Sequence, residues 1–182
     1  MSKYKTVVIT GCSSIGKTTL AKYLLAKYPE LSLVNSYTTR EKRAEDVNYI
    51  HISLDEFKSL VFSNQFADYN EVWTNTFYGT KWESLQNLTK EGKMPLLVTD
   101  NVGAANYFEI TDCLLINLIP RDLDIVRQRI LALRSDNVEQ RLDTLNHGSL
   151  GYGNDFYIRN NFQEDGHIEV IENLIENWIN IK

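Results

Sequence analysis

The octapeptide GCSSIGKT, Gly11 to Thr18, lies between the apolar run YKTVVIT (residues 4–10) and the segment KTTLAKYLLAKY (residues 17–28). It matches the pattern G-x-x-x-x-G-K-S/T, and its flanks read as a strand and a helix, which is the context that this motif requires. In such a loop the glycines let backbone N–H groups point at phosphate oxygens, Lys17 reaches the β- and γ-phosphates, and the Thr18 hydroxyl ligates Mg²⁺. We therefore predict a nucleoside triphosphate site. Its residues are Gly11, Ser13, Ser14, Ile15, Gly16, Lys17, Thr18 and Thr19.

The composition indicates one globular domain. The chain has 182 residues, of which 43% are hydrophobic, and this is enough for a single core. The net charge of -5 provides no basic field that would attract nucleic acid or an anionic membrane. Cys12 and Cys113 have no metal-ligand spacing and are too few for a disulfide framework, and no apolar run approaches the ~20 residues of a membrane span. We expect a soluble, cytoplasmic protein, whose oligomeric state the sequence leaves open.

Apolar runs beyond the loop predict a layered α/β fold. The segments MPLLVTD (94–100) and CLLINLI (113–119) are nearly all hydrophobic, as strands covered on both faces of a parallel sheet should be, and DFYIRN (155–160) is a further candidate strand. The C-terminal segment repeats apolar residues on one helical face. These are Ile168, Ile171, Leu174, Ile175, Trp178 and Ile181.

The middle of the chain, about residues 36–90, departs from this pattern. VNYIHIS (47–53) and FADYNEVWTNTFYGT (66–80) combine clustered aromatic residues with Asn and Gly turn signals. We interpret them as short antiparallel strands that form a small lobe inserted in the α/β body.

The stretch SYTTREKR (36–43) is a candidate second anion site. Arg40 and Arg43 are three residues apart, so a turn or an irregular loop could bring both guanidinium groups onto one phosphate. Tyr49, Tyr78 and Ser36 add hydroxyl donors. The alternative is a solvated charged loop.

A phosphate acceptor would explain why no general base stands out. A nucleoside monophosphate is mostly a dianion at neutral pH and is already a nucleophile, so the reaction requires cations and positioning. His51, His147 and His167 belong to no recognisable catalytic arrangement.

A third group of cations follows residue 121. Arg127, Arg134 and Arg141 are spaced by seven, which would place them on one face of a continuous helix. They could form a mobile lid whose guanidinium groups close on the transferred phosphoryl group. The alternative is a surface helix paired with acids such as Asp124 and Glu139.

Together these features resemble the guanylate kinase family over almost the whole chain. The family pattern is a phosphate loop, S-x-T-T-R-x-x-R, a tyrosine, F-x-E leading to Y-G-T/S, an apolar strand ending in Asp with Gly three residues later, and an arginine-bearing lid. The corresponding residues here are Gly11 to Thr18, Ser36, Thr38, Thr39, Arg40, Arg43, Tyr49, Phe66-Ala67-Asp68, Tyr78-Gly79-Thr80, Asp100, Gly103 and the arginines from 127 to 141.

The resemblance implies a single P-loop NTPase domain with a three-layer α/β/α core and a parallel sheet. The core would comprise residues 1–35, 92–120 and 155–182. The nucleotide-binding lobe would span about 36–90, and a short helical lid about 121–150. The implied reaction is GMP + ATP to GDP + ADP with Mg²⁺.

The resemblance also implies roles for individual residues. The GMP phosphate would be held by Ser36, Arg40, Arg43, Tyr49 and Tyr78. The guanine edge would be read by Asp68, Thr80 and Asp100, because a carboxylate can accept from both guanine N1–H and the 2-amino group. Asp100 could instead join Thr18 at Mg²⁺. The catalytic cations would be Lys17, Arg40, Arg43, Arg134 and Arg141.

Some positions depart from the family pattern. Position 68 is Asp where the family usually has Glu, and Glu71 is a second candidate for reading guanine. The lid segment ALRSDNVEQRL lacks the R-G-T/S tripeptide and is shorter. The alternatives are a kinase of the same fold acting on another nucleotide or a phosphorylated sugar, and a non-catalytic binding module of this family.

Overall fold

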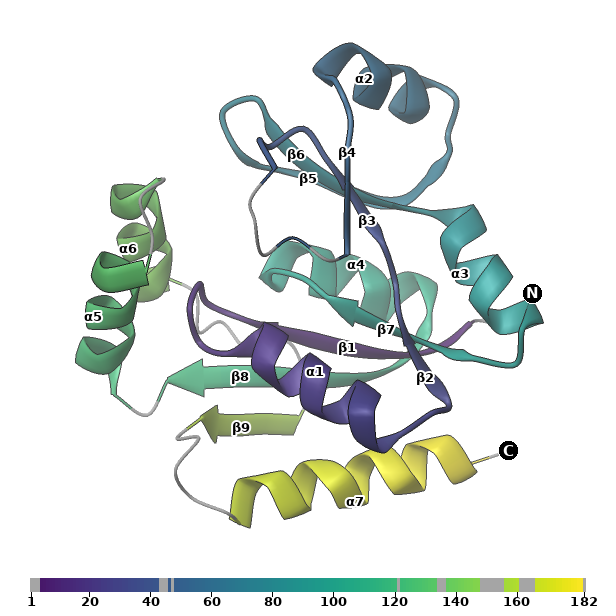
Figure 1. The fold of residues 1–182 in the computed structure, drawn as a ribbon, viewed down its shortest axis with the longest axis vertical. Coiled ribbons are helices and arrows are strands. Elements are labelled where there is room, and N and C mark those ends of the chain that lie inside the picture. Colours follow the sequence, from purple (N-terminus) through teal and green to yellow (C-terminus); the bar gives the residue numbers. More distant parts are fainter. Residues whose placement is uncertain are drawn as a thin grey trace.

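The computed structural model describes residues 4–42, 46, 48–120, 122–133, 137–147, 156–160 and 166–181. A core sheet flanked by helices forms the body of the molecule, with a second sheet above it and a pair of helices at one side (Figure 1). We call these three parts the core, the lobe and the lid. No helix among the described residues is long and apolar enough to cross a bilayer.

The core sheet has the strand order β2-β7-β1-β8-β9, and every pairing in it is parallel. Its strands are β1 Lys5–Gly11, β2 Leu31–Leu33, β7 Met94–Val98, β8 Asp112–Pro120 and β9 Phe156–Asn160. The predicted parallel sheet is confirmed, and the four predicted strands coincide with β1, β7, β8 and β9. The three-residue β2 was not predicted, because so short a segment has no periodicity to detect.

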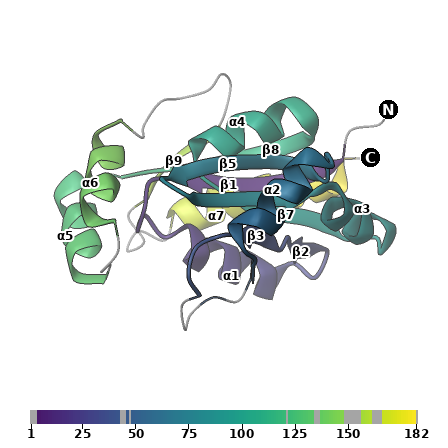
Figure 2. The same ribbon diagram turned by 90° about the horizontal axis from the view of Figure 1, so that it is seen from above.

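Helices cover both faces of this sheet (Figure 2). They are α1 Lys17–Lys27, α3 Trp82–Lys90, α4 Asn101–Ile110 and α7 Gly166–Asn180. Alternate residues of β1 point to opposite faces: Val7 belongs to the apolar cluster that includes α1 and α7, whereas Val8 belongs to the cluster that includes α3 and α4. The three-layer arrangement is therefore confirmed. Most of the predicted apolar face of α7 packs into the first cluster, with Ile171 and Ile175 buried. Ile181, which was predicted on the same face, lies beyond the end of α7 and is exposed.

The lobe is a four-stranded sheet of order β4-β3-β6-β5. Its elements are β3 Ser36–Thr38, β4 Tyr49–His51, β5 Phe66–Trp73, β6 Thr76–Lys81 and the helix α2 Leu54–Phe62. The predicted antiparallel pairing is present between β5 and β6 and between β3 and β6, but β3 and β4 pair in parallel, so the expectation of a wholly antiparallel lobe was wrong. A tight hairpin would force antiparallel pairing, whereas the long connection between β3 and β4 allows the chain to return in the same direction.

The lid consists of two helices, α5 Leu123–Leu133 and α6 Val138–His147. The continuous helix considered for Arg127, Arg134 and Arg141 is therefore wrong. Asn137 has a φ of 51°, a left-handed conformation that a continuous right-handed helix does not contain. Arg127 is exposed and Arg141 is buried, so these two arginines do not share a face.

Candidate functional site

The phosphate loop is shaped by two glycines with positive φ. Gly11 has a φ of 138°, and a Cβ at this position would lie 2.4 Å from the carbonyl oxygen of Leu118. Gly16, with a φ of 104°, is the N-cap of α1, and no side chain caps this helix. The helix therefore begins without a side-chain cap from its N-cap residue, as anion-binding helix N-termini often do.

Lys17 extends back along the loop. Its Nζ donates to the carbonyl oxygens of Gly11 at 2.6 Å and Cys12 at 2.9 Å, so the ammonium lies within the curve of the loop. Thr18 and Thr19 are exposed, whereas the Ile15 side chain is buried in the core cluster and can offer a ligand only its backbone. Burial raises the pKa of the Cys12 thiol despite the nearby charge of Lys17, so this thiol stays protonated.

Strand register places five of the predicted acceptor-site residues on one face of the lobe sheet. Partners across a pair, and residues two apart along a strand, share a face. Ser36 pairs with Tyr49, Thr38 with Tyr78, and Asp68 with Thr80. This face, which we call the ligand face, thus carries Ser36, Tyr49, Asp68, Tyr78 and Thr80. The opposite face is covered by α2, whose Phe57 stacks on Phe66 with ring centroids 4.6 Å apart.

Arg40 meets two tyrosines at one end of the ligand face. Its Nε donates to the Tyr78 hydroxyl at 3.0 Å, and its Cζ lies 5.1 Å from the centre of the Tyr49 ring. Its Nη2 forms an ion pair with Asp46 at 2.7 Å, and only 8% of the Arg40 side chain is exposed. Such burial contradicts the alternative of a solvated charged loop for Arg40, although the neighbouring Glu41 and Lys42 are exposed. Arg43 lies outside the described residues.

Sequence reasoning missed the support around Arg40. Asp46 holds the guanidinium, and the imidazole of His51 lies between Asp46 and the Arg40 carbonyl oxygen, at 3.1 and 2.7 Å. Asp46 was not found because an acid three residues after a basic run resembles ordinary surface charge. The pairing of Asp46 with Arg40 becomes evident only once β4 lies beside β3 in the folded lobe.

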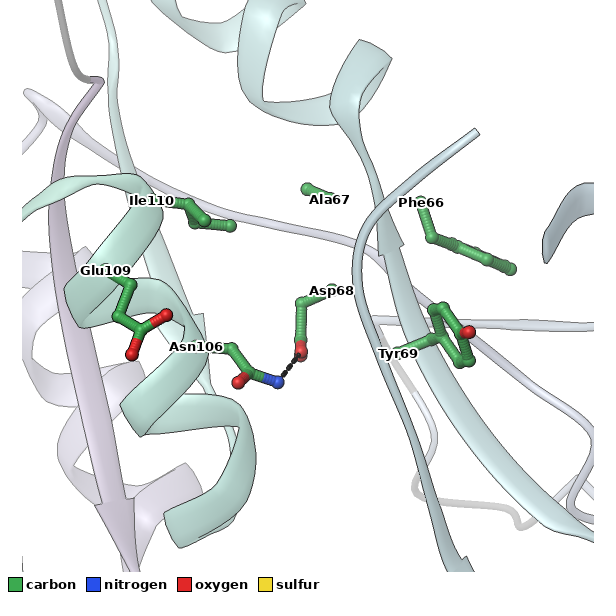
Figure 3. A pocket seen from close by; sticks show the side chains of 7 residues that line it. All are labelled: Phe66, Ala67, Asp68, Tyr69, Asn106, Glu109 and Ile110. Atoms are coloured by element: carbon green, nitrogen blue, oxygen red, sulfur yellow. Dashed lines mark hydrogen bonds between the residues drawn. The ribbon is translucent and has the colours of Figure 1, made fainter. Parts of the chain in front are cut away.

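Two acid–amide pairs join the lobe to α4 at the other end of the ligand face. Asn106 on α4 donates to Asp68 at 2.6 Å, and Asn70 on β5 donates to Asp100 at 3.2 Å. Figure 3 shows the first pair, in which the side chains of Asn106 and Asp68 point toward each other across the gap between α4 and β5. Each pair takes one partner from the core and one from the lobe. Neither asparagine was predicted, because an isolated Asn carries no sequence signal for such a contact.

The environment of Asp68 disfavours its charged form. Burial raises the pKa of Asp68 to about 6, the hydrogen bond from Asn106 opposes this rise, and the charge of Asp100 adds to it. A small pocket of about 210 Å³ opens beside this carboxyl group. It is lined by Phe66, Ala67, Asp68, Tyr69, Asn106, Glu109 and Ile110.

The remaining candidates for base recognition differ in their surroundings. Glu71 is exposed and accepts the Asn75 backbone N–H at 2.8 Å in the β5–β6 turn, so it lies away from Asp68. Thr80 is buried on the ligand face, with 3% exposure. Geometry therefore favours Asp68 over Glu71.

Asp100 is engaged on both carboxylate oxygens. One accepts the Gly103 N–H at 2.9 Å as the N-cap of α4, and the other accepts from Asn70. This arrangement favours the acceptor side of the site over a Mg²⁺ shell. No group of three His, Cys, Asp or Glu side chains in the described part of the chain could hold a metal by itself. Thr18, exposed at the start of α1, is one residue of the loop able to supply a hydroxyl ligand.

Arg141 brings the lid to the phosphate loop. Its Nη1 donates to the Ser13 hydroxyl at 2.7 Å, and its Cζ lies 4.6 Å from the centre of the Trp73 ring. Arg127 instead faces solvent beside Asp124, with 4.0 Å between the charged atoms, as the surface-helix alternative expects. Arg134 lies outside the described residues.

Comparisons with known proteins agree on one family. A family model described as guanylate kinase matches residues 3–174. A guanylate kinase from Symbiobacterium thermophilum is 34% identical over 137 residues, covering 73% of this chain and 64% of that protein. One from Salinibacter ruber is 32% identical over 152 residues, covering 75% of this chain and 80% of that protein. The alignments thus span slightly less than two thirds of some of these relatives.

Solved structures share the fold. A guanylate kinase from Anaplasma phagocytophilum superposes with a TM-score of 0.72 at 21% identity, covering 97% of this chain and 87% of that one. An unliganded sugar kinase from a Janibacter species gives a TM-score of 0.51 at 14% identity, with 98% and 95% covered. At these identities the likeness concerns the fold alone.

Proposed function

The chain belongs to the guanylate kinase family, and on this premise we propose that it transfers the γ-phosphoryl group of ATP to GMP, giving ADP and GDP. The observation that carries the proposal is the ligand face of the lobe. It has a cationic phosphate site around Arg40 at one end and the acceptor carboxylate of Asp68 at the other. A molecule with a phosphate at one end and a donor-rich base at the other fits this arrangement.

The donor nucleotide is assigned to the phosphate loop. Loop N–H groups and the Lys17 ammonium would hold the β- and γ-phosphates, and Arg141 would reach them from the Ser13 side. Mg²⁺, when bound with the nucleotide, neutralises phosphate charge, and the Thr18 hydroxyl is its protein ligand in this assignment.

The chemical step needs no protein base. An oxygen of the GMP phosphate dianion forms a bond to the γ-phosphorus of ATP while the bond from that phosphorus to the β,γ-bridging oxygen breaks, and ADP leaves. Arg40, Tyr49 and Tyr78 would hold the acceptor phosphate in line, and Lys17 and Arg141 would offset the charge on the transferred group.

Guanine selectivity would arise at Asp68. An ionised carboxylate accepts from guanine N1–H and the 2-amino group, whereas adenine has no such pair of donors and would leave the buried acceptor unpaired. Asp100 would assist from the core side, since Asn70 and the N-terminus of α4 fix its carboxylate.

An acceptor profile tests the proposal. ADP formation should be measured in a coupled assay with GMP, dGMP, AMP, CMP, UMP and a phosphorylated ribose. We expect turnover with GMP and dGMP and less than about 1% of it with AMP, in line with the large losses that an unpaired buried polar group causes. Turnover confined to another nucleotide or to the phosphorylated sugar would overturn the guanine assignment and leave the kinase class standing.

Calorimetry separates the kinase from a non-catalytic module. The intact phosphate loop predicts that ATP with Mg²⁺ binds in the absence of GMP. A chain that bound no ATP and turned over no acceptor would be a binding module of the family rather than an enzyme.

A further inference from the structure

Trp73 lies at the far end of β5, at a break in the alternation of that strand. Glu71 pairs with Phe77 and Trp73 pairs with Thr76, so Val72 is an extra residue on β5, as in a β-bulge. Without the bulge, Trp73 would point to the same face of the lobe sheet as Glu71, which is the face that α2 covers. The partner Thr76 is two residues from Tyr78, so the bulge turns Trp73 onto the ligand face.

At this position Trp73 meets Arg141. The Arg141 Cζ lies 4.6 Å from the centre of the indole ring, and its Nη1 donates to Ser13 of the phosphate loop at 2.7 Å. Three parts of the molecule therefore converge on one guanidinium: the lobe through Trp73, the lid through α6, and the core through Ser13. Arg141 is only 6% exposed, so its side chain is surrounded by protein groups rather than by water.

The indole itself is not anchored through its nitrogen. The Trp73 Nε1 is buried and has no hydrogen-bond acceptor among the described residues. The ring rather than the N–H is thus what meets Arg141.

We propose that Trp73 is a positioning residue: its ring, turned inward by the bulge, holds Arg141 at the phosphate loop and so links the position of the acceptor lobe to that of the lid arginine beside the donor phosphates. The inference rests on the proposed function for the role of Arg141 in phosphoryl transfer. It adds a lobe residue that reaches the donor side of the site.

Kinetics of two Trp73 variants test the proposal. Trp73→Leu removes the π face and should lower kcat about tenfold, about 1.4 kcal/mol, with the KM for GMP within twofold, because Arg40 and Asp68 are untouched. Trp73→Phe keeps an aromatic face and should retain at least a third of the wild-type kcat. An unchanged kcat in Trp73→Leu, or an equal loss in Trp73→Phe, would overturn it. Trp82→Phe, which alters a tryptophan packed on Tyr4 far from Arg141, is the matched control.

A double-mutant cycle distinguishes positioning from a general structural effect. In an Arg141→Lys background, Trp73→Leu should cause less than a twofold further loss of kcat. Independent, multiplicative losses would contradict the proposal. Circular dichroism melts of each variant establish that it is folded.

Fluorescence tests the contact without relying on the acceptor. The protein has three tryptophans, so Trp82→Phe/Trp178→Phe leaves Trp73 as the sole reporter. ATP with Mg²⁺ should change its emission, and Arg141→Lys should abolish the change. A silent Trp73 would overturn the inference even if GMP is the substrate. A responsive Trp73 in a protein that does not phosphorylate GMP would instead show that the proposed function is wrong and the contact is real.

Discussion

At the residue scale, Arg40 shows how a side chain acquires a role from its neighbours. Tyr78, Tyr49 and Asp46 hold its guanidinium on three sides. Because five N–H donors lie in one plane, the group can keep these contacts and still present an edge to a phosphate. A lysine at this position would provide charge without this geometry.

Arg40→Lys is therefore expected to raise the KM for GMP at least tenfold and to leave the KM for ATP within twofold, because the phosphate loop is unaffected. Steady-state kinetics with each substrate varied in turn provide the measurement. Lys42→Ala, two residues away on an exposed side chain, is the control and should match the wild type. Equal changes in both KM values would show that Arg40 does not belong to the acceptor site.

The pKa of Asp68 predicts a dependence of stability on pH. Since burial raises this pKa from 3.8 to about 6, the folded protein binds the proton more tightly than the unfolded chain. Its contribution to stability is fully present below pH 4 and is lost as the pH rises through 6. Asp68→Asn, which stays neutral, should be more stable than the wild type at pH 7.5 by on the order of 2 kcal/mol, and the difference should vanish near pH 4. Urea unfolding at the two pH values measures this difference in the free energy of unfolding. A difference that did not change with pH would contradict the raised pKa of Asp68.

At the element scale, the β1–α1 loop depends on backbone conformation more than on side chains. Gly11 and Gly92 both have positive φ, but only Gly11 is crowded: a Cβ there meets the Leu118 carbonyl oxygen at 2.4 Å, whereas nothing lies within 4 Å of one at Gly92. The pair allows conformational strain to be separated from steric overlap.

Gly92→Ala should cost about 1 kcal/mol through backbone strain alone, whereas Gly11→Ala should cost more than about 3 kcal/mol and abolish ATP binding, because β8 cannot move away from β1 without breaking the sheet. Thermal unfolding and calorimetric ATP titration provide the two measurements. Similar melting temperatures for the two variants would show that the close approach of Leu118 is relieved by local adjustment.

The sequence predicted some helices and strands and missed others, and the difference depends on their apolar pattern. Hydrophobic runs located β1, β7 and β8 because buried parallel strands are apolar throughout, and turn residues located the β5–β6 hairpin. The helices α2, α3 and α4 were missed because they span only nine, nine and ten residues, too short for a helical period to stand out in the sequence. The break between α5 and α6 was missed because a left-handed Asn137 leaves no signal in a seven-residue spacing.

At the scale of the whole molecule, two reciprocal side-chain hydrogen bonds hold the lobe to the core. Asn70 of the lobe binds Asp100 of the core, and Asn106 of the core binds Asp68 of the lobe. Both bonds involve a charged acceptor and lie in a partly buried gap, where such hydrogen bonds are stronger than at the surface. They set the position of the lobe over α4.

The double variant Asn70→Ala/Asn106→Ala removes both amides. The lobe should then separate from the core more often than in the wild type. Hydrogen exchange in β5 and β6 should become at least tenfold faster, whereas exchange in β1 and β8 should be unchanged, because local opening exposes only the lobe. Gln65→Ala, at an exposed position of the lobe, is the control. Faster exchange throughout the chain would indicate global destabilisation rather than release of the lobe.

The sequence by itself determined the family and the parallel α/β core, and it predicted the phosphate loop and the residues of the proposed acceptor site. Each of these depends on local chemistry: glycine backbone freedom, a lysine and a hydroxyl at fixed spacing, and uninterrupted apolar strands. Only the tertiary structure decided that Arg40 is buried against Asp46, that Asp68 rather than Glu71 faces α4, and that a bulge turns Trp73 toward Arg141. The contact of Arg40 with Asp46 closes a local loop, whereas the other two join segments far apart in the chain. In all three the partners are specified by strand register and packing, which no local pattern encodes.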